Sequence, residues 1–148
     1  MEKKIIKEFI DLGLGFPVKI HNAPMVKVRG VWALSVDHNL LNKSVAIALA
    51  HSDGRITGNQ LKFIRYFFKM TLKEFGARFG VAHPTVISWE KKFKKPTHME
   101  WGTEKDIRME IVNRIYNNPE LIGKLFSNLT AKPKHSSEEL DLPVLEVA

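Results

Sequence analysis

The chain has 148 residues, no cysteine and a formal net charge of +7, and its pI is near 9.7. A hydrophobic content of 44% is enough for a buried core, so the sequence predicts a globular protein and not a disordered one. The lack of cysteine excludes disulfides, thiol catalysis and cysteine-based zinc sites. No apolar run approaches the length of a membrane span, and residues 1–11 mix lysine and glutamate into their hydrophobic residues, unlike a signal peptide. We therefore expect a cytoplasmic protein with no membrane partner.

Residues 1–54 predict a small β-hairpin followed by a helix. The stretch 16–36 is extended, because residues 26–29 alternate apolar and basic side chains, and residues 21–24 (His-Asn-Ala-Pro) form a turn candidate between two short strands. A helix follows from Asp37 and ends at residues 52–54 (Ser-Asp-Gly). Its apolar face comprises Leu41, Val45, Ala48 and Leu49.

Residues 55–130 predict five helices. Two of them begin with a capping-box pair, Thr57 with Gln60 and Thr71 with Glu74, and span about 58–69 and 72–79. Gly80 ends the second, because glycine tolerates a left-handed backbone. The third helix spans about 83–92. The last two begin after Thr103 and at Asn118-Pro119.

Residues 131–148 predict a flexible acidic tail, since they contain two lysines, four acidic residues and no sustained hydrophobic period. Its apolar end, residues 140–147, could also bind a partner or the basic face of the protein. The whole chain is thus expected to be mainly α, with a five-helix body between a small β element and a loose tail.

Basic residues are concentrated between residues 60 and 95, where nine lysines and arginines accompany only Glu74 and Glu90. Such a concentration favours a polyanionic partner. The nine are Lys62, Arg65, Lys69, Lys73, Arg78, Lys91, Lys92, Lys94 and Lys95.

The segment 71–90 satisfies the packing rules of a helix-turn-helix unit, in which two short helices cross steeply. The position where the second helix passes close to the first is Gly76, and the position of the sharp turn is Gly80. The positions that hold the unit on its core are all apolar. They are Phe75, Phe79, Val81, Val86 and Trp89.

With these residues, the stretch 70–90 (MTLKEFGARFGVAHPTVISWE) resembles the Cro/C1, or Xre, family of DNA-binding proteins, and the resemblance covers about residues 61–117 with the flanking helices. Two positions depart from the family pattern. Leu72 stands where the family often has glutamine, which removes a common DNA contact, and Gly76 stands where it often has alanine, which should loosen the helix by up to about 1 kcal/mol.

The resemblance implies that the helix 83–92 enters the major groove of double-stranded DNA. His83, Pro84 and Ser88 are then the candidates for base contacts. Hydroxyl and ammonium groups beside them are candidates for phosphate contacts, which position the protein without reading sequence. These are Thr71, Lys73, Thr85, Lys91, Lys92, Lys94 and Lys95. Trp89, Phe67 and Phe68 are expected to be core residues instead of base-stacking ones.

We expect a homodimer, because one reading helix contacts too few base pairs for useful affinity. A dimer could bind two half-sites about 34 Å apart. Candidate dimer surfaces are the hairpin around 26–32 and the last helix around 122–129. The expected function is a transcriptional regulator, most simply a repressor, that needs no metal or cofactor. Enzymatic activity is not expected, because the six histidines are dispersed and no hydrolase or phosphate-binding motif is present.

An alternative is the antitoxin of a toxin–antitoxin pair. The stretch 15–30 (GFPVKIHNAPMVKVRG) resembles the segment that precedes the helix-turn-helix in MqsA-type antitoxins, which bind a protein toxin and repress their own operon. The zinc-binding cysteines of that family are missing here, so any toxin would have to bind a metal-free surface. A small basic protein that co-purifies with the chain would favour this alternative.

Overall fold

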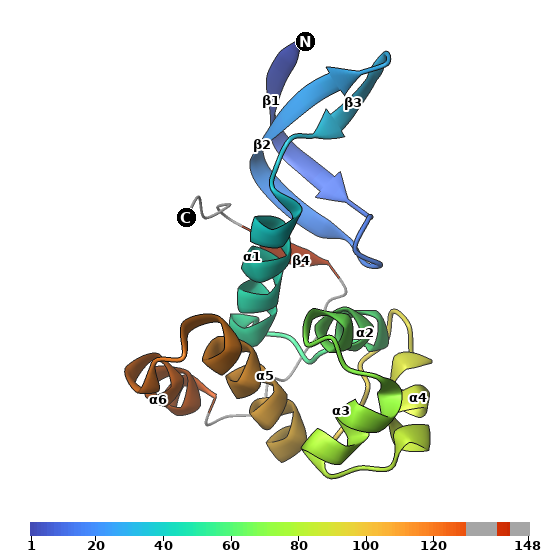
Figure 1. Cartoon of the computed structure of the whole chain (residues 1–148), viewed down its shortest axis with the longest axis vertical. Coiled ribbons are helices and arrows are strands. Elements are labelled where there is room, and N and C mark those ends of the chain that lie inside the picture. Colours follow the sequence, from blue (N-terminus) through green and yellow to red (C-terminus); the bar gives the residue numbers. More distant parts are fainter. Residues whose placement is uncertain (130–138, 143–148) are drawn as a thin grey trace.

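The computed structural model describes residues 1–129 and 139–142, and this part of the chain is an α+β fold with six helices and four strands (Figure 1). The mainly-α prediction with a five-helix body is therefore wrong. The strands are β1 (Lys3–Asp11), β2 (Val18–Val28), β3 (Val31–Leu34) and β4 (Leu140–Leu142). The helices are α1 (His38–His51), α2 (Gly58–Phe67), α3 (Leu72–Phe79), α4 (His83–Glu90), α5 (Trp101–Tyr116) and α6 (Pro119–Asn128).

The mixed sheet has β2 at its centre. One edge of β2 pairs antiparallel with β1. The other edge pairs with two strands: the start of β2 is parallel to β4, and the end of β2 is antiparallel to β3. β1 was not predicted from the sequence, because its lysines and glutamate leave most of the strand exposed on both faces and hide the alternation.

The turn predicted at residues 21–24 does not exist, since these residues belong to the continuous strand β2. Val18 and Ile20 are buried before this point and Ala23 and Met25 after it, so the buried side of the strand shifts by one residue. Asn22, with a φ of 53°, is the residue at which the shift occurs. A strand that changes its buried face loses its alternation of buried and exposed residues, and in the sequence this break resembles a turn.

Pro24 is compatible with a position inside β2 because its backbone carbonyl faces away from β1. Its carbonyl accepts a hydrogen bond of 2.8 Å from the Ser35 amide, so its polar groups face away from β1. The missing N–H of the proline therefore removes no bond from the β1–β2 ladder.

Part of the segment predicted as a flexible tail is a strand. Leu140 and Leu142 of β4 are almost completely buried, and Asp141 lies 2.7 Å from the His21 ring on β2. Three residues are too few to show a period, so only the two leucines could have indicated this strand. The remainder of the predicted tail, residues 131–138 and 143–148, lies outside the described residues.

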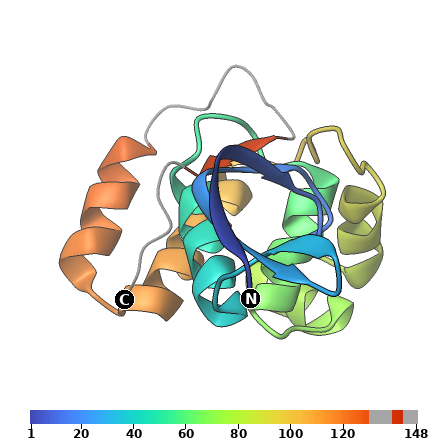
Figure 2. The same cartoon turned by 90° about the horizontal axis from the view of Figure 1, so that it is seen from above.

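The helices form a layer below the sheet, and α1 leads from the sheet into it (Figure 1). Figure 2, seen from above, places α4 and α6 at opposite sides of the molecule, in agreement with Figure 1. One hydrophobic cluster joins both layers: Val18 and Ile20 of the sheet belong to the same core as Leu61 of α2 and Ile107 of α5. The predicted N-terminal unit, residues 1–54, thus shares its core with the helical body.

Helix boundaries agree with the predictions to within three residues. Asp37 caps α1, Thr57 and Thr71 form the expected capping boxes on α2 and α3, and Asn118 caps α6. The differences are at ends: α2 stops at Phe67, α4 stops at Glu90, and α5 begins at Trp101 instead of after Thr103.

A buried charge network connects α5 to the loop after α1. Arg108 is fully buried and donates to Glu104 at 2.9 Å and to the Ser52 carbonyl at 2.6 Å. Arg55 donates to the other Glu104 oxygen at 2.9 Å. Burial lowers the pKa of Arg108, and Glu104 opposes this shift. The helical layer depends on these bonds, because each buried charge needs its partner.

Replacement of Arg108 by alanine should lower the free energy of unfolding by about 3–5 kcal/mol, since it leaves carbonyls and Glu104 short of a donor inside the core. Arg78 pairs with Asp106 at 3.2 Å on the surface, and Arg78→Ala should cost no more than about 1 kcal/mol. Urea denaturation measures both. Equal destabilisation of the two variants would contradict the role given to the buried network.

Candidate nucleic-acid interface

α3 and α4 form a two-helix unit with well-defined ends. Glu74 accepts a 3.0 Å hydrogen bond from the Thr71 amide, and the Thr71 hydroxyl accepts one of 3.1 Å from the Glu74 amide. The Thr71 backbone amide, and secondarily the Thr71 side chain, hold the pKa of the Glu74 carboxyl below its usual value. Gly80 ends α3 with a φ of 75°, in the left-handed region that glycine adopts without strain. Only residues 80–82 separate the two helices.

The turn between the helices requires a glycine at position 76. A Cβ atom placed on Gly76 would lie 2.5 Å from the Val81 carbonyl oxygen, a distance that real Cβ atoms do not show. Phe75 and Val86 are fully buried beside it, and Phe79 nearly so, while Val81 and Trp89 are half-buried against the core. The predicted packing positions of this unit are therefore confirmed as inward-facing.

Arg65 of α2 fixes the far end of α4. Its guanidinium donates two hydrogen bonds to the Glu90 carboxylate, at 2.6 and 3.1 Å, and a third to the Met70 carbonyl at 3.1 Å. The hydrogen bond to Glu90 raises the pKa of Arg65 further. The two charges therefore neutralise each other within the protein. Arg65 does not contribute to the basic surface that the sequence predicts for this region.

The lysine-rich segment after α4 is attached to the start of α2. Gly58 donates a 3.1 Å backbone hydrogen bond to Lys95, and Asn59 donates one of 2.9 Å to the carbonyl of Phe93. A Cβ atom on Gly58 would lie within 2.7 Å of the backbone of Trp89, Glu90 and Phe93. The segment 91–95, here called the lysine loop, is therefore held rigidly against α2.

The structure places the predicted contact residues on the α3–α4 unit and the lysine loop, and all but Thr85 are exposed. His83, Pro84 and Ser88 are exposed on α4, and Thr85 is half-buried beside them. Pro84, Ile87, Ser88, Lys91 and Lys92 line a shallow hollow of about 420 Å³. The other predicted residues are exposed at the start of α3 and in the lysine loop. They are Thr71, Lys73, Lys94 and Lys95.

Phe93 is a surface residue that was not predicted from the sequence. It lies in the middle of the lysine loop and its side chain is 61% exposed. The signal was present in the sequence, since this aromatic residue stands between two pairs of lysines (KKFKK, residues 91–95).

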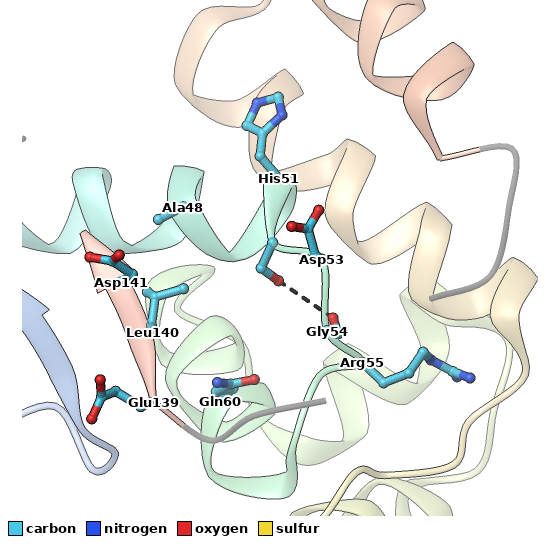
Figure 3. A pocket seen from close by; sticks show the side chains of 10 residues that line it. Ala48, His51, Asp53, Gly54, Arg55, Gln60, Glu139, Leu140 and Asp141 are labelled. Atoms are coloured by element: carbon cyan, nitrogen blue, oxygen red, sulfur yellow. Dashed lines mark hydrogen bonds between the residues drawn. The ribbon is translucent and has the colours of Figure 1, made fainter. Parts of the chain in front are cut away.

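A second cavity, of about 380 Å³, lies between the end of α1 and β4 (Figure 3). His51, Asp53 and Arg55 line it, but their side chains point in different directions, and Arg55 points away toward α5. Burial, and secondarily Arg108, lower the pKa of His51. These three side chains therefore do not converge on one point in the cavity (Figure 3).

Within residues 1–129 and 139–142, no cluster of three or more histidine, aspartate or glutamate side chains could hold a metal ion. In the same part of the chain, no helix is both long and apolar enough to cross a membrane.

Comparison with known proteins found no match to a family model, a curated protein or a solved structure.

Gly76→Ala should destabilise the protein by about 1–3 kcal/mol, because the added methyl group overpacks against the Val81 carbonyl. Gly123→Ala in α6 is the matched control. A Cβ there meets nothing within 4 Å, so alanine should stabilise by about 0.5–1 kcal/mol. Thermal unfolding measures both, and a Gly76→Ala variant as stable as the parent protein would refute the close approach.

Proposed function

We propose that this protein is a sequence-specific DNA-binding transcriptional regulator, most simply a repressor, that inserts α4 into the major groove. The observation that carries the proposal is the α3–α4 unit. Two short helices joined by three residues, with one helix exposed along its outer face, are the arrangement of a helix-turn-helix motif. The resemblance of residues 70–90 to the Cro/C1 family supports the same interpretation.

Charge around α4 fits this function. Lys91, Lys92, Lys94 and Lys95 extend from its end and are all exposed, while the acidic Glu90 is paired with Arg65 and withdrawn from the surface. Lys73 lies at the start of α3, beside the exposed Thr71 hydroxyl. Lysines at both ends of the unit would bind phosphates along the groove that α4 occupies.

Base contacts are assigned to His83, Pro84 and Ser88. They occupy the first turns of α4, the part of a recognition helix that meets base edges. A histidine and a serine can each make single hydrogen bonds but not the bidentate pairs that discriminate best. Specificity should therefore depend in part on DNA shape and bridging water.

Selection of bound duplexes from a random DNA library tests the proposal. We expect a palindromic consensus, and a His83→Ala, Ser88→Ala double variant should bind it more weakly by about 1–3 kcal/mol for each base that is no longer read. A His38→Ala, Ser127→Ala variant changes the same residue types at exposed positions of α1 and α6 and should bind like the parent protein.

Two outcomes would contradict the proposal. One is the absence of a consensus, with binding that collapses as the salt concentration rises, since this indicates contact with the phosphate backbone alone. The other is a consensus that the double variant binds as tightly as the parent protein, since α4 would then not read it.

We infer a homodimer that forms through the end of the sheet remote from the helices, here called the β-arm and comprising residues 2–6 and 24–34. Ile5, Val28 and Val31 are exposed on it, with Val31 at 66%. The last helix is the weaker candidate, because Leu125 and Leu129 are buried and Lys105 lies 3.7 Å above the Phe126 ring. A dimer would carry two copies of α4, one for each half-site of a palindrome.

Val31→Glu should convert the dimer to a monomer, because a charge in the centre of an apolar interface is left without a partner. Phe126→Ser should leave the dimer intact. Size-exclusion chromatography with light scattering distinguishes the two species. A parent protein that is monomeric on its DNA, or a Val31→Glu variant that remains dimeric, would overturn this assignment.

The antitoxin alternative requires a surface for a protein partner that does not overlap α4. The β-arm is such a surface, since it exposes the apolar side chains of Ile5, Val28 and Val31 and projects from the opposite end of the molecule to α3 (Figure 1). Co-purification of a second, basic protein that the Val31→Glu variant fails to retain would favour this alternative over the homodimer.

A further inference from the structure

Phe93 occupies the centre of the lysine loop without a structural role in the core. Its ring is 61% exposed, and it does not belong to the hydrophobic cluster or to the half-buried residues packed against it in the described part of the chain. Phe126, another exposed phenylalanine, differs because Lys105 covers its ring at 3.7 Å. Single exposed apolar side chains are common on protein surfaces, and what distinguishes Phe93 is its position among four lysines directly after α4.

The backbone presents this ring to solvent. Phe93 has a φ of 54°, in the left-handed region that is unfavourable for a bulky side chain. Hydrogen bonds on both sides fix it: its amide donates to Glu90 at 3.3 Å, its carbonyl accepts from Asn59 at 2.9 Å, and Lys95 donates to Lys92 at 3.0 Å. Gly58 allows this close approach, since a Cβ atom there would lie 2.6 Å from the Phe93 nitrogen. Residues held in such conformations cluster at functional sites.

We propose that Phe93 is a DNA-contacting residue whose ring packs against the sugars and bases of the duplex next to the groove that α4 occupies. This inference rests on the proposed function. The adjacent lysines neutralise phosphates on either side, and burial of the ring adds an attraction that does not depend on counterion release. Apolar side chains that contact DNA in this way also act as wedges between base steps.

The salt dependence of DNA affinity distinguishes the contribution of the Phe93 ring from that of the lysines. Phe93→Ala should weaken binding to a selected duplex by about 10-fold or more, the size of effect expected when a phenylalanine ring that is buried on binding is removed. The slope of log affinity against log salt concentration should stay unchanged. Lys92→Ala should instead reduce that slope by about 0.9, since one phosphate is no longer neutralised.

Two further variants keep the test independent of folding. Phe93→Asn removes the ring with a residue that tolerates the left-handed backbone, and it should lose affinity as Phe93→Ala does. Phe126→Ala removes an exposed ring on α6, at the opposite side of the molecule from α4, and should bind like the parent protein (Figure 2). Unchanged thermal unfolding of the Phe93 variants would show that the loss of affinity lies in binding.

The outcomes are distinct for the two proposals. If the parent protein binds DNA and the Phe93→Ala and Phe93→Asn variants bind equally well, the contact assigned to the ring is wrong and the proposed function stands. If the parent protein binds no duplex, the proposed function fails and this inference fails with it. A change of salt slope in the Phe93 variants would also overturn the inference, because the ring would then act through the placement of the lysines.

Discussion

The guanidinium of Arg65 connects three segments of the chain. It extends from α2, donates to the Met70 carbonyl just before α3, and makes a two-pronged ion pair with Glu90 at the end of α4. The two side chains are only 9% and 11% exposed, so either charge without the other would be strongly destabilising. The position of α4 relative to α2 and α3 depends on this pair. It also removes the single acidic side chain of α4 from the surface, which leaves the lysines beside it unopposed.

Two close backbone contacts, at Gly76 and at Gly58, also fix the position of α4. Gly76 lets the chain turn sharply from α3 to α4, and Gly58 lets the start of α2 contact the backbone from Trp89 to Phe93. α4 is thus held at both ends by close contacts that a larger residue at position 76 or 58 would disturb. The same contacts fix the lysine loop, so its charges and the ring of Phe93 have defined positions instead of belonging to a loose basic segment. A preorganised surface loses less conformational entropy when a ligand binds.

Much of the helical part could be predicted from sequence, because its signals are local. Capping boxes at Thr57 and Thr71, the glycine at 80 and the apolar spacing of residues 75–89 each specify a neighbour a few residues away. The sheet depends on distant pairing, and its strands gave weak signals: most of β1 is exposed, Asn22 shifts the buried face of β2, and β4 is too short to show a period. Of the candidate site, the exposed face of α4 was predictable, whereas the pairing of Arg65 with Glu90 and the exposure of Phe93 required tertiary contacts.

The most direct test of DNA binding by the α3–α4 unit is NMR titration of the isotope-labelled protein with a selected DNA duplex, which reports the contacted residues one by one. We expect the largest amide shifts in α4, the lysine loop and the start of α3, with the buried Arg65 and Glu90 region retaining its structure. Shifts that concentrate in the β-arm and leave α4 unaffected would contradict the claim that the α3–α4 unit is the surface that binds DNA.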